Sequence, residues 1–270
     1  MEIAIGLDPF RIADWGALAE YVIEVERLGV ASVWAAETWA HDAATPLAFL
    51  AARTRTIALG TGVLQLGARS PANIAMTALS LATMSGGRFR LGLGVSGPQV
   101  LEGWHGVPFA RPLRRTRETI AIVRMALRGE RVRYDGAIYR LPLPGGAGKA
   151  LTLGGRPPGA VPIYLATLGP QNLELTGELA DGWLGTSFAP EGADAFLGPL
   201  AAGAARAGRT LADLDLQVSA GAVAFARDEG EATALLAARE PGLAFTLGAM
   251  GSAEQNFYNA AWARAGHAAA

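Results

Sequence analysis

The chain has 270 residues, of which 51% are hydrophobic and 17% charged, so it can build a large core and is too apolar for a disordered chain. It contains no cysteine, which excludes disulfides, thiol nucleophiles and cysteine-ligated metals, and its single lysine is Lys149. The net charge of −1 does not suggest a nucleic-acid partner. No apolar run has the length of a membrane span, and the first residues lack a signal-peptide pattern. We therefore expect a cytoplasmic protein without a membrane partner.

Short apolar strands alternate with helices along the first half of the chain. Apolar residues at helical spacing predict a helix at 14–28, which Gly29 ends. In chain order the predicted elements are strand 2–7, helix 14–28, strand 32–37, helix 46–54, strand 56–65, helix 71–85, strand 88–96 and helix 113–127. Strands that are almost continuously apolar are typical of a parallel sheet buried between helices.

The alternation breaks at residues 130–160 and then resumes. The segment 131–141 contains Asp135-Gly136 and predicts a hairpin, and a loop rich in Gly and Pro follows it. We interpret 130–160 as an insertion between two repeats and not as a domain linker. The remaining predicted elements are strand 161–167, helix 171–180, strand 181–187, helix 192–208, strand 214–226, helix 230–239 and helix 254–266.

The pattern predicts an α/β fold in which residues 1–270 form one domain, a TIM-type (β/α) barrel with the insertion after its fourth unit. A complete barrel of this type has eight strands, and the sequence offers seven. The eighth strand is therefore expected to be missing.

Three strand ends that contain glycine carry the candidate chemistry. The sequence GLGVSG at 92–97 fits a dinucleotide-binding turn, close packing of a strand end, or a cofactor loop of a barrel. TGVLQLGARSP at 61–71 indicates either close approach of the backbone to a ligand or a simple kink. LATLGPQN at 165–172 offers free helix amides to an anion, and an ordinary turn explains it equally well.

Polar residues crowd the loop after the second predicted strand. Glu37, Thr38 and His41 follow that strand, and the carboxyl ends of barrel strands form the catalytic face. We interpret His105 as a packing or capping residue and His267 as solvated. The aromatic and small residues at 242–266 either pack as a terminal helix or line an apolar substrate pocket near it. The sequence has no motif of paired metal ligands, and no metal site is predicted.

Taken together, these segments resemble the luciferase-like monooxygenase family, and most closely its branch that uses the deazaflavin coenzyme F420, which includes the methylenetetrahydromethanopterin reductase-like group. The resemblance covers nearly the whole chain. It is carried by TRTIALGTGVLQLGARSP (54–71), GRFRLGLGVSGPQVLEGWHG (87–106), PIYLATLGPQNLELTGELADGW (162–183) and GLAFTLGAMGSAEQNFYNAAW (242–262).

The resemblance implies which residues contact the cofactor. A non-proline cis peptide in the third strand would match Gly62-Val63 and support the deazaflavin ring. The implied cofactor-binding residues are Gly62, Val63, Gln65, Ser96, Gly97, Pro98 and Gln99, with Leu168, Gly169, Gln171 and Asn172 around the phosphate. Glu37, Thr38 and His41 are the candidates for polar catalytic roles. Some relatives have Asp-His where this chain has Glu37-Thr38, which argues against a sugar-phosphate substrate.

The implied activity is hydride transfer between coenzyme F420 and a small organic substrate, in a protein expected to form a homodimer. Three alternatives stay open: an FMN-dependent monooxygenase with a separate flavin reductase, a truncated or degenerate member with little catalysis, and a nicotinamide-dependent dehydrogenase. Similar proteins usually continue into an eighth strand. We therefore expect either that this chain omits a C-terminal portion of the natural protein or that a partner or terminal helix covers the gap.

Overall fold

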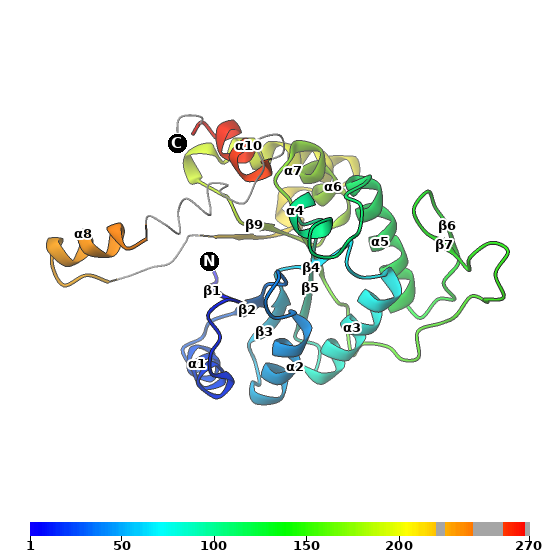
Figure 1. The fold of residues 1–270 in the computed structure, drawn as a ribbon, viewed down its shortest axis with the longest axis horizontal. Coiled ribbons are helices and arrows are strands. Elements are labelled where there is room, and N and C mark those ends of the chain that lie inside the picture. Colours follow the sequence, from blue (N-terminus) through cyan, green and yellow to red (C-terminus); the bar gives the residue numbers. More distant parts are fainter. Residues whose placement is uncertain (220–224, 240–255, 268–270) are drawn as a thin grey trace. The chain divides into compact units, whose positions relative to one another are not determined.

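The computed structural model of the protein describes residues 1–219, 225–239 and 256–267. The chain separates into two compact units (Figure 1). The first unit holds residues 1–166 and 179–182, and the second holds 167–178 and 183–270. Each unit has its own hydrophobic core and is described by itself.

A parallel sheet forms the centre of the first unit. Its strands lie in the order β1-β2-β3-β5-β8, and the two-residue strand β4 pairs with β5. The strands are β1 (Ala4–Leu7), β2 (Ser32–Ala35), β3 (Ala58–Thr61), β4 (Leu64–Gln65), β5 (Phe89–Gly94) and β8 (Ile163–Ala166). The helices of this unit are α1 (Trp15–Arg27), α2 (Ala44–Arg53), α3 (Pro71–Met84), α4 (Pro98–Leu101) and α5 (Pro112–Leu127).

Local signals in the sequence begin these helices where they were predicted. The Asp14 carboxylate accepts hydrogen bonds from the backbone N–H groups of Gly16 and Ala17 at the start of α1. Ser70 caps α3, and Pro71 occupies the first turn, where a missing N–H costs nothing. The α2 and α3 helices pack beside one another, as do α3 and α5. Their apolar faces and the sheet share one core, which includes Leu47, Leu59, Ile74, Leu91 and Ile120.

The hairpin predicted within residues 131–141 is confirmed. Strands β6 (Tyr134–Asp135) and β7 (Arg140–Leu141) pair antiparallel. Glu118 of α5, which is 1% exposed, accepts hydrogen bonds from three consecutive backbone N–H groups between them, at residues 137–139. One buried carboxylate therefore holds the hairpin against the helix.

The second unit contains β9 (Gly182–Gly185), β10 (Asp215–Val218), α6 (Pro170–Leu179), α7 (Asp194–Arg206), α8 (Glu229–Ala237), α10 (Phe257–Arg264) and two short 3-10 turns, η1 (Pro190–Gly192) and η2 (Leu211–Asp213). Trp183, Phe196 and Leu200 form the middle of its core. Gly177 and Gly203 let α6 and α7 pack in backbone contact, because a Cβ on Gly203 would overlap the carbonyl oxygen of Glu174.

The structure corrects several predicted boundaries. The third strand is not continuous from 56 to 65, since it breaks at Gly62-Val63 into β3 and β4. Helix α4 was not predicted, because its four residues are too few for a periodic pattern. The last predicted strand ends at Val218 rather than 226, while residues 220–224 of that prediction lie outside the described residues. Most of the predicted pocket segment at 242–266 also lies outside them. No further parallel strand follows β10 in the described parts of the chain.

Candidate active site

The carboxyl ends of β2, β4 and β5 bring the candidate residues of the first unit together. The loop after β2 carries Glu37, Thr38 and His41, and the segment after β4 carries Arg69. All three strands are parallel, so their carboxyl ends share one edge of the sheet. The predicted catalytic residues thus lie on the edge where the sequence analysis expected them.

An extra residue in the third strand sets which side chains meet at this edge. Leu59 pairs with Phe89, 30 residues later, whereas Leu64 pairs with Leu93, 29 residues later. The third strand therefore has one residue more than β5 between these pairs, which is a β-bulge. The predicted cis peptide at Gly62-Val63 is confirmed. Val63 packs against Gly94, where an added Cβ would come within 2.6 Å of the Val63 methyl.

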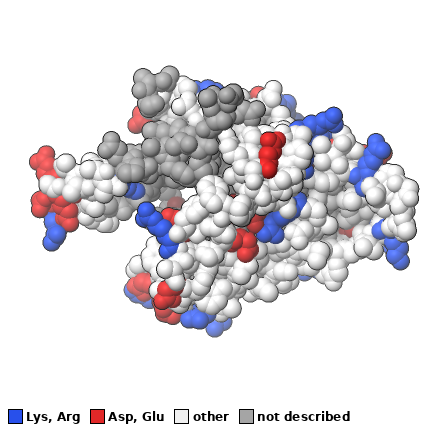
Figure 2. All heavy atoms as spheres, viewed as in Figure 1, with Lys and Arg blue, Asp and Glu red and all other residues white. Residues whose placement is uncertain are grey.

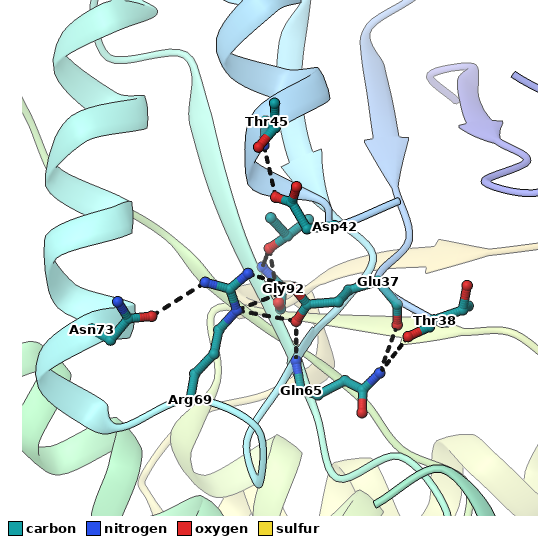
Figure 3. A network of polar contacts seen from close by, with 9 residues as sticks. Glu37, Thr38, Asp42, Thr45, Gln65, Arg69, Asn73 and Gly92 are labelled. Carbon is teal, nitrogen blue, oxygen red and sulfur yellow. Dashed lines mark hydrogen bonds and ion pairs between the residues drawn. The ribbon is translucent and has the colours of Figure 1, made fainter. Parts of the chain in front are cut away.

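A polar network centred on Glu37 occupies this edge (Figure 3). The Arg69 guanidinium donates to Glu37 from Nη2 at 2.5 Å and from Nε at 3.1 Å, and its Nη1 donates to Asn73 at 3.2 Å. The backbone N–H of Gln65 donates to Glu37 Oε2 at 3.1 Å. The Gln65 amide nitrogen donates to the carbonyl oxygens of Glu37 and Thr38 at 3.0 and 3.3 Å. The Glu37 carboxylate therefore ties the loop after β2 both to β4 and to the segment that follows β4.

Hydrogen bonds favour the charged forms of Arg69 and of the neighbouring Asp42. The Glu37 side chain is 9% exposed and that of Arg69 is 20% exposed. The hydrogen bonds to Glu37 raise the pKa of Arg69, in opposition to its burial. Burial alone would raise the pKa of Asp42, but hydrogen bonds from Thr45 and Ala44 together lower it, so Asp42 is ionised at neutral pH.

A cleft of about 430 Å³ opens beside the network. His41 lies in its wall and contacts the Trp15 ring edge-on, with ring centroids 4.9 Å apart. Trp39 packs on Phe10 at 5.2 Å. The cleft is lined by Glu37, Thr38, Trp39, Ala40, His41, Asp42, Ala68, Arg69, Ser70, Asn73, Trp104 and His105.

Some polar atoms at this edge lack a hydrogen-bond partner among the described residues. They include Thr38 Oγ1, Gln65 Oε1 and His105 Nε2, all of which are shielded from solvent. Buried polar atoms without partners are rare in folded proteins, and a bound ligand is one of the explanations for them.

The loop after β5 holds four of the predicted cofactor-binding residues. Ser96 adopts the left-handed backbone conformation at φ = 59°, which is uncommon for any residue except glycine. Gly97 follows, and Pro98 begins α4 with Gln99 behind it. Residues held in such conformations cluster at ligand sites.

The remaining predicted cofactor-binding residues lie in the second unit, at the start of α6. The Leu168 carbonyl oxygen accepts a hydrogen bond from Arg264, and the Gly169 carbonyl accepts one from the N–H of Leu173. The side-chain oxygen of Asn172 is buried without a partner in the described residues. Gln171 is exposed beside it. This helix start has free amides of the kind that bind anions.

Sequence reasoning missed several residues of the cleft. Arg69, Asn73 and Trp104 were not candidates, and His105 was interpreted as packing or capping although it lines the cleft. The sequence did contain one signal for Arg69. It is a cation shortly after the end of one strand, and Glu37 is an acid shortly after the end of another. The distance of 32 residues between Glu37 and Arg69 hid the pairing.

Comparison with known proteins places these features in a family context. A family model described as luciferase-like monooxygenase matches residues 4–270. A Mycobacterium tuberculosis protein named as a coenzyme F420-dependent oxidoreductase is 43% identical over 268 residues, which covers 95% of this chain and 77% of that protein. The 5,10-methylenetetrahydromethanopterin reductase of Methanolobus tindarius is 36% identical over 223 residues, or 82% of this chain and 65% of the reductase.

A solved structure confirms the fold. The coenzyme F420-dependent tetrahydromethanopterin reductase from Methanopyrus kandleri superposes with a TM-score of 0.73 at 23% identity, over 80% of this chain and 65% of that one. The predicted α/β fold of the luciferase-like, TIM-type class is therefore correct.

The surface charge and the helix lengths bear on the kinds of partner that the protein can have. On the face in Figure 2, the acidic and basic side chains of the described residues lie in small groups with uncharged surface between them. Within the described ranges, no helix has the length and apolar character needed to cross a membrane.

Proposed function

Because the chain belongs to the luciferase-like monooxygenase family, we propose that it is an oxidoreductase that transfers a hydride between coenzyme F420 and a small organic substrate. Relatives named for this coenzyme support the proposal. The structural observation that carries it is the group of unpartnered polar atoms beside the Glu37 network, at the carboxyl edge of the sheet.

The residues present fit a large flat ring with polar edges. In the first unit, Gln65 Oε1 is a buried polar atom that a ring could satisfy, and the Gly62-Val63 segment would support one face of the ring. The loop at Ser96, Gly97, Pro98 and Gln99 would hold its edge. In the second unit, we assign the phosphate to the start of α6, with Leu168, Gly169, Gln171 and Asn172.

The protein contributes position and proton control, because bound coenzyme F420 supplies the ring that accepts or donates the hydride. Arg69 and the Gln65 N–H hold Glu37 in one orientation, so Glu37 shapes the site and does not move. His41 lies in the cleft wall and contacts Trp15 edge-on, and we assign it the transfer of the substrate proton. Thr38 lines the same wall and would hydrogen-bond the reacting group.

The test is a titration of the purified chain with oxidised coenzyme F420, followed by the fluorescence of the cofactor. We expect saturable quenching, and Gln65→Ala should raise the dissociation constant about tenfold because one polar contact is lost. Gln217→Ala is the matched control, since the Gln217 side chain donates to Asp215 and lies in β10, outside the Glu37 network. An absence of saturable quenching would refute the proposal.

Parallel titrations separate the alternatives. Tight binding of FMN without binding of coenzyme F420 would support a flavin monooxygenase, and binding of NADPH alone would support a nicotinamide enzyme. Binding of none of the three would support a degenerate member. We also propose that residues 1–270 act as one barrel domain in a cytoplasmic homodimer, which analytical ultracentrifugation and cell fractionation can test.

A further inference from the structure

Two exposed tryptophans lie in the wall of the cleft. Trp39 is 39% exposed and Trp104 is 66% exposed, and they come from different loops, after β2 and after α4. Large aromatic side chains are usually buried, because each has a large apolar area to remove from water. Phe10 packs on Trp39 and holds one of these rings in place. The cleft thus combines a polar floor with aromatic surface that a ligand could cover.

The charged residues of the cleft disfavour an anionic ligand. Arg69 is the cation among the described lining residues, and its donors are directed to Glu37 and Asn73. Asp42 adds a second carboxylate to that of Glu37. The two carboxylates and the one guanidinium therefore give the lining an excess of one negative charge. A phosphate or carboxylate would meet a net negative wall whose guanidinium is already paired.

Neutral hydrogen-bonding groups are available in the same wall. Thr38 Oγ1 and His105 Nε2 have no partner among the described residues. A carbonyl or hydroxyl group could use either atom without any charge. A planar ring could cover the exposed tryptophan faces at the same time.

We propose that the substrate taken by this cleft is an uncharged, planar ring compound with one carbonyl or hydroxyl group, bound against Trp39 and Trp104. This inference rests on the proposed function, because it names the substrate class for that reaction. A carbonyl compound of this class gains two electrons and two protons to become an alcohol. The hydride comes from reduced coenzyme F420 and the second proton from the protein or water.

The experiment measures binding of three bicyclic ketones, 1-indanone, 1-tetralone and 4-chromanone, to the protein saturated with coenzyme F420. Each ketone is paired with a derivative that carries a carboxylate on the distal ring, and glucose 6-phosphate is added as an anionic sugar. Isothermal titration calorimetry gives the dissociation constants, and tryptophan fluorescence reports contact with the rings. We expect at least one ketone to bind at least tenfold more tightly than its carboxylate.

Single substitutions locate the binding. Trp39→Ala and Trp104→Ala should each raise the dissociation constant of that ketone about tenfold, because the covered aromatic area is lost. Tyr21→Ala is the matched control, since Tyr21 is 52% exposed on α1 and does not line the cleft, and it should change nothing. Asp42→Asn should improve binding of the carboxylate about threefold by removing one negative charge.

The outcomes separate the two proposals. Binding of coenzyme F420 without binding of any ketone, or with equal binding of ketones and carboxylates, overturns the substrate class and leaves the proposed function standing. Displacement of coenzyme F420 by a ketone overturns it as well, because the tryptophans would then belong to the cofactor site. It is also overturned if Trp104→Ala changes only the oligomeric state. Failure of coenzyme F420 to bind refutes the proposed function, whatever the ketones do.

Discussion

The ion pair between Arg69 and Glu37 should contribute more to stability than a surface pair of similar length. Exposed pairs contribute about 0.2–1 kcal/mol, while breaking a buried pair costs about 3–5 kcal/mol. The Arg69–Glu37 pair lies between these limits but near the buried one, since its side chains are 20% and 9% exposed. It also has a double contact through Nε and Nη2. We therefore expect a coupling energy of about 2 kcal/mol.

The measurement is a double-mutant cycle with Arg69→Met, Glu37→Gln and the double variant, with urea unfolding at pH 7 followed by far-ultraviolet circular dichroism. Arg69→Met should lower the free energy of unfolding by about 3 kcal/mol, because it leaves the nearly buried Glu37 carboxylate without its cation. The double variant should lower it by no more than that. The control cycle uses Arg27 and Glu24, which form a 2.7 Å pair with side chains 69% and 53% exposed. That coupling should be much smaller than the one between Arg69 and Glu37, because solvent screens an exposed pair. Equal couplings in the two cycles would refute the reasoning.

Three further substitutions test other parts of the chain. Gly203→Ala should destabilise the second unit by about 3 kcal/mol, because the new methyl overlaps the Glu174 carbonyl. Gly198→Ala in the same helix meets no atom within 4 Å and should stabilise the unit by about 0.5–1 kcal/mol. Urea unfolding measures both changes, and changes of the same sign would contradict the packing argument. For Glu118, burial raises the pKa but the backbone hydrogen bonds at 137–139 outweigh it and lower the folded-state pKa, so its stabilisation is present above its unfolded pKa of about 4.3 and is lost as pH falls through the lower folded value. Glu118→Gln should therefore cost about 2–3 kcal/mol at pH 7 and progressively less in acid, and a cost independent of pH down to pH 3 would contradict this. Ser96→Gly should raise the free energy of unfolding by about 0.5–1 kcal/mol, since glycine adopts φ = 59° without steric cost. A lower free energy of unfolding in a thermal melt would contradict strain at this residue.

Much of the architecture could be predicted because its signals are local. Asp14 predicts the start of α1, and Ser70 with Pro71 predicts the start of α3, each within three residues of the helix start. The hairpin at 134–141 follows from a short turn signal. Local chemistry of this kind is complete within a few residues, so a single sequence contains it.

The rest depended on contacts between distant segments. An apolar run from 56 to 65 looks continuous, and the extra residue that divides it is visible only when β5 is laid beside it. Glu37 was a candidate by position, but its partner Arg69 lies 32 residues away. His105 has no periodic or motif signal and enters the cleft only through the loop after α4. Tertiary placement decided each of these cases.

The extra residue in the third strand makes chain length, and not only residue type, a determinant of what this site presents. In a strand, successive side chains alternate between the two faces, so a shift of one position exchanges them. Gln65 pairs opposite Gly94 across the bulge, so removal of one residue at 62–63 would restore regular pairing and leave Gln65 in place. Addition of one residue to a bulge of unchanged size would instead move Leu64 into that place and turn the Gln65 side chain to the other face. Libraries that vary only the identity of residues 61–64 would keep Gln65 against Glu37 and Thr38. Redesign of the cleft for a different ligand therefore has two separate variables, the side chains at its edge and the number of residues that lead to it.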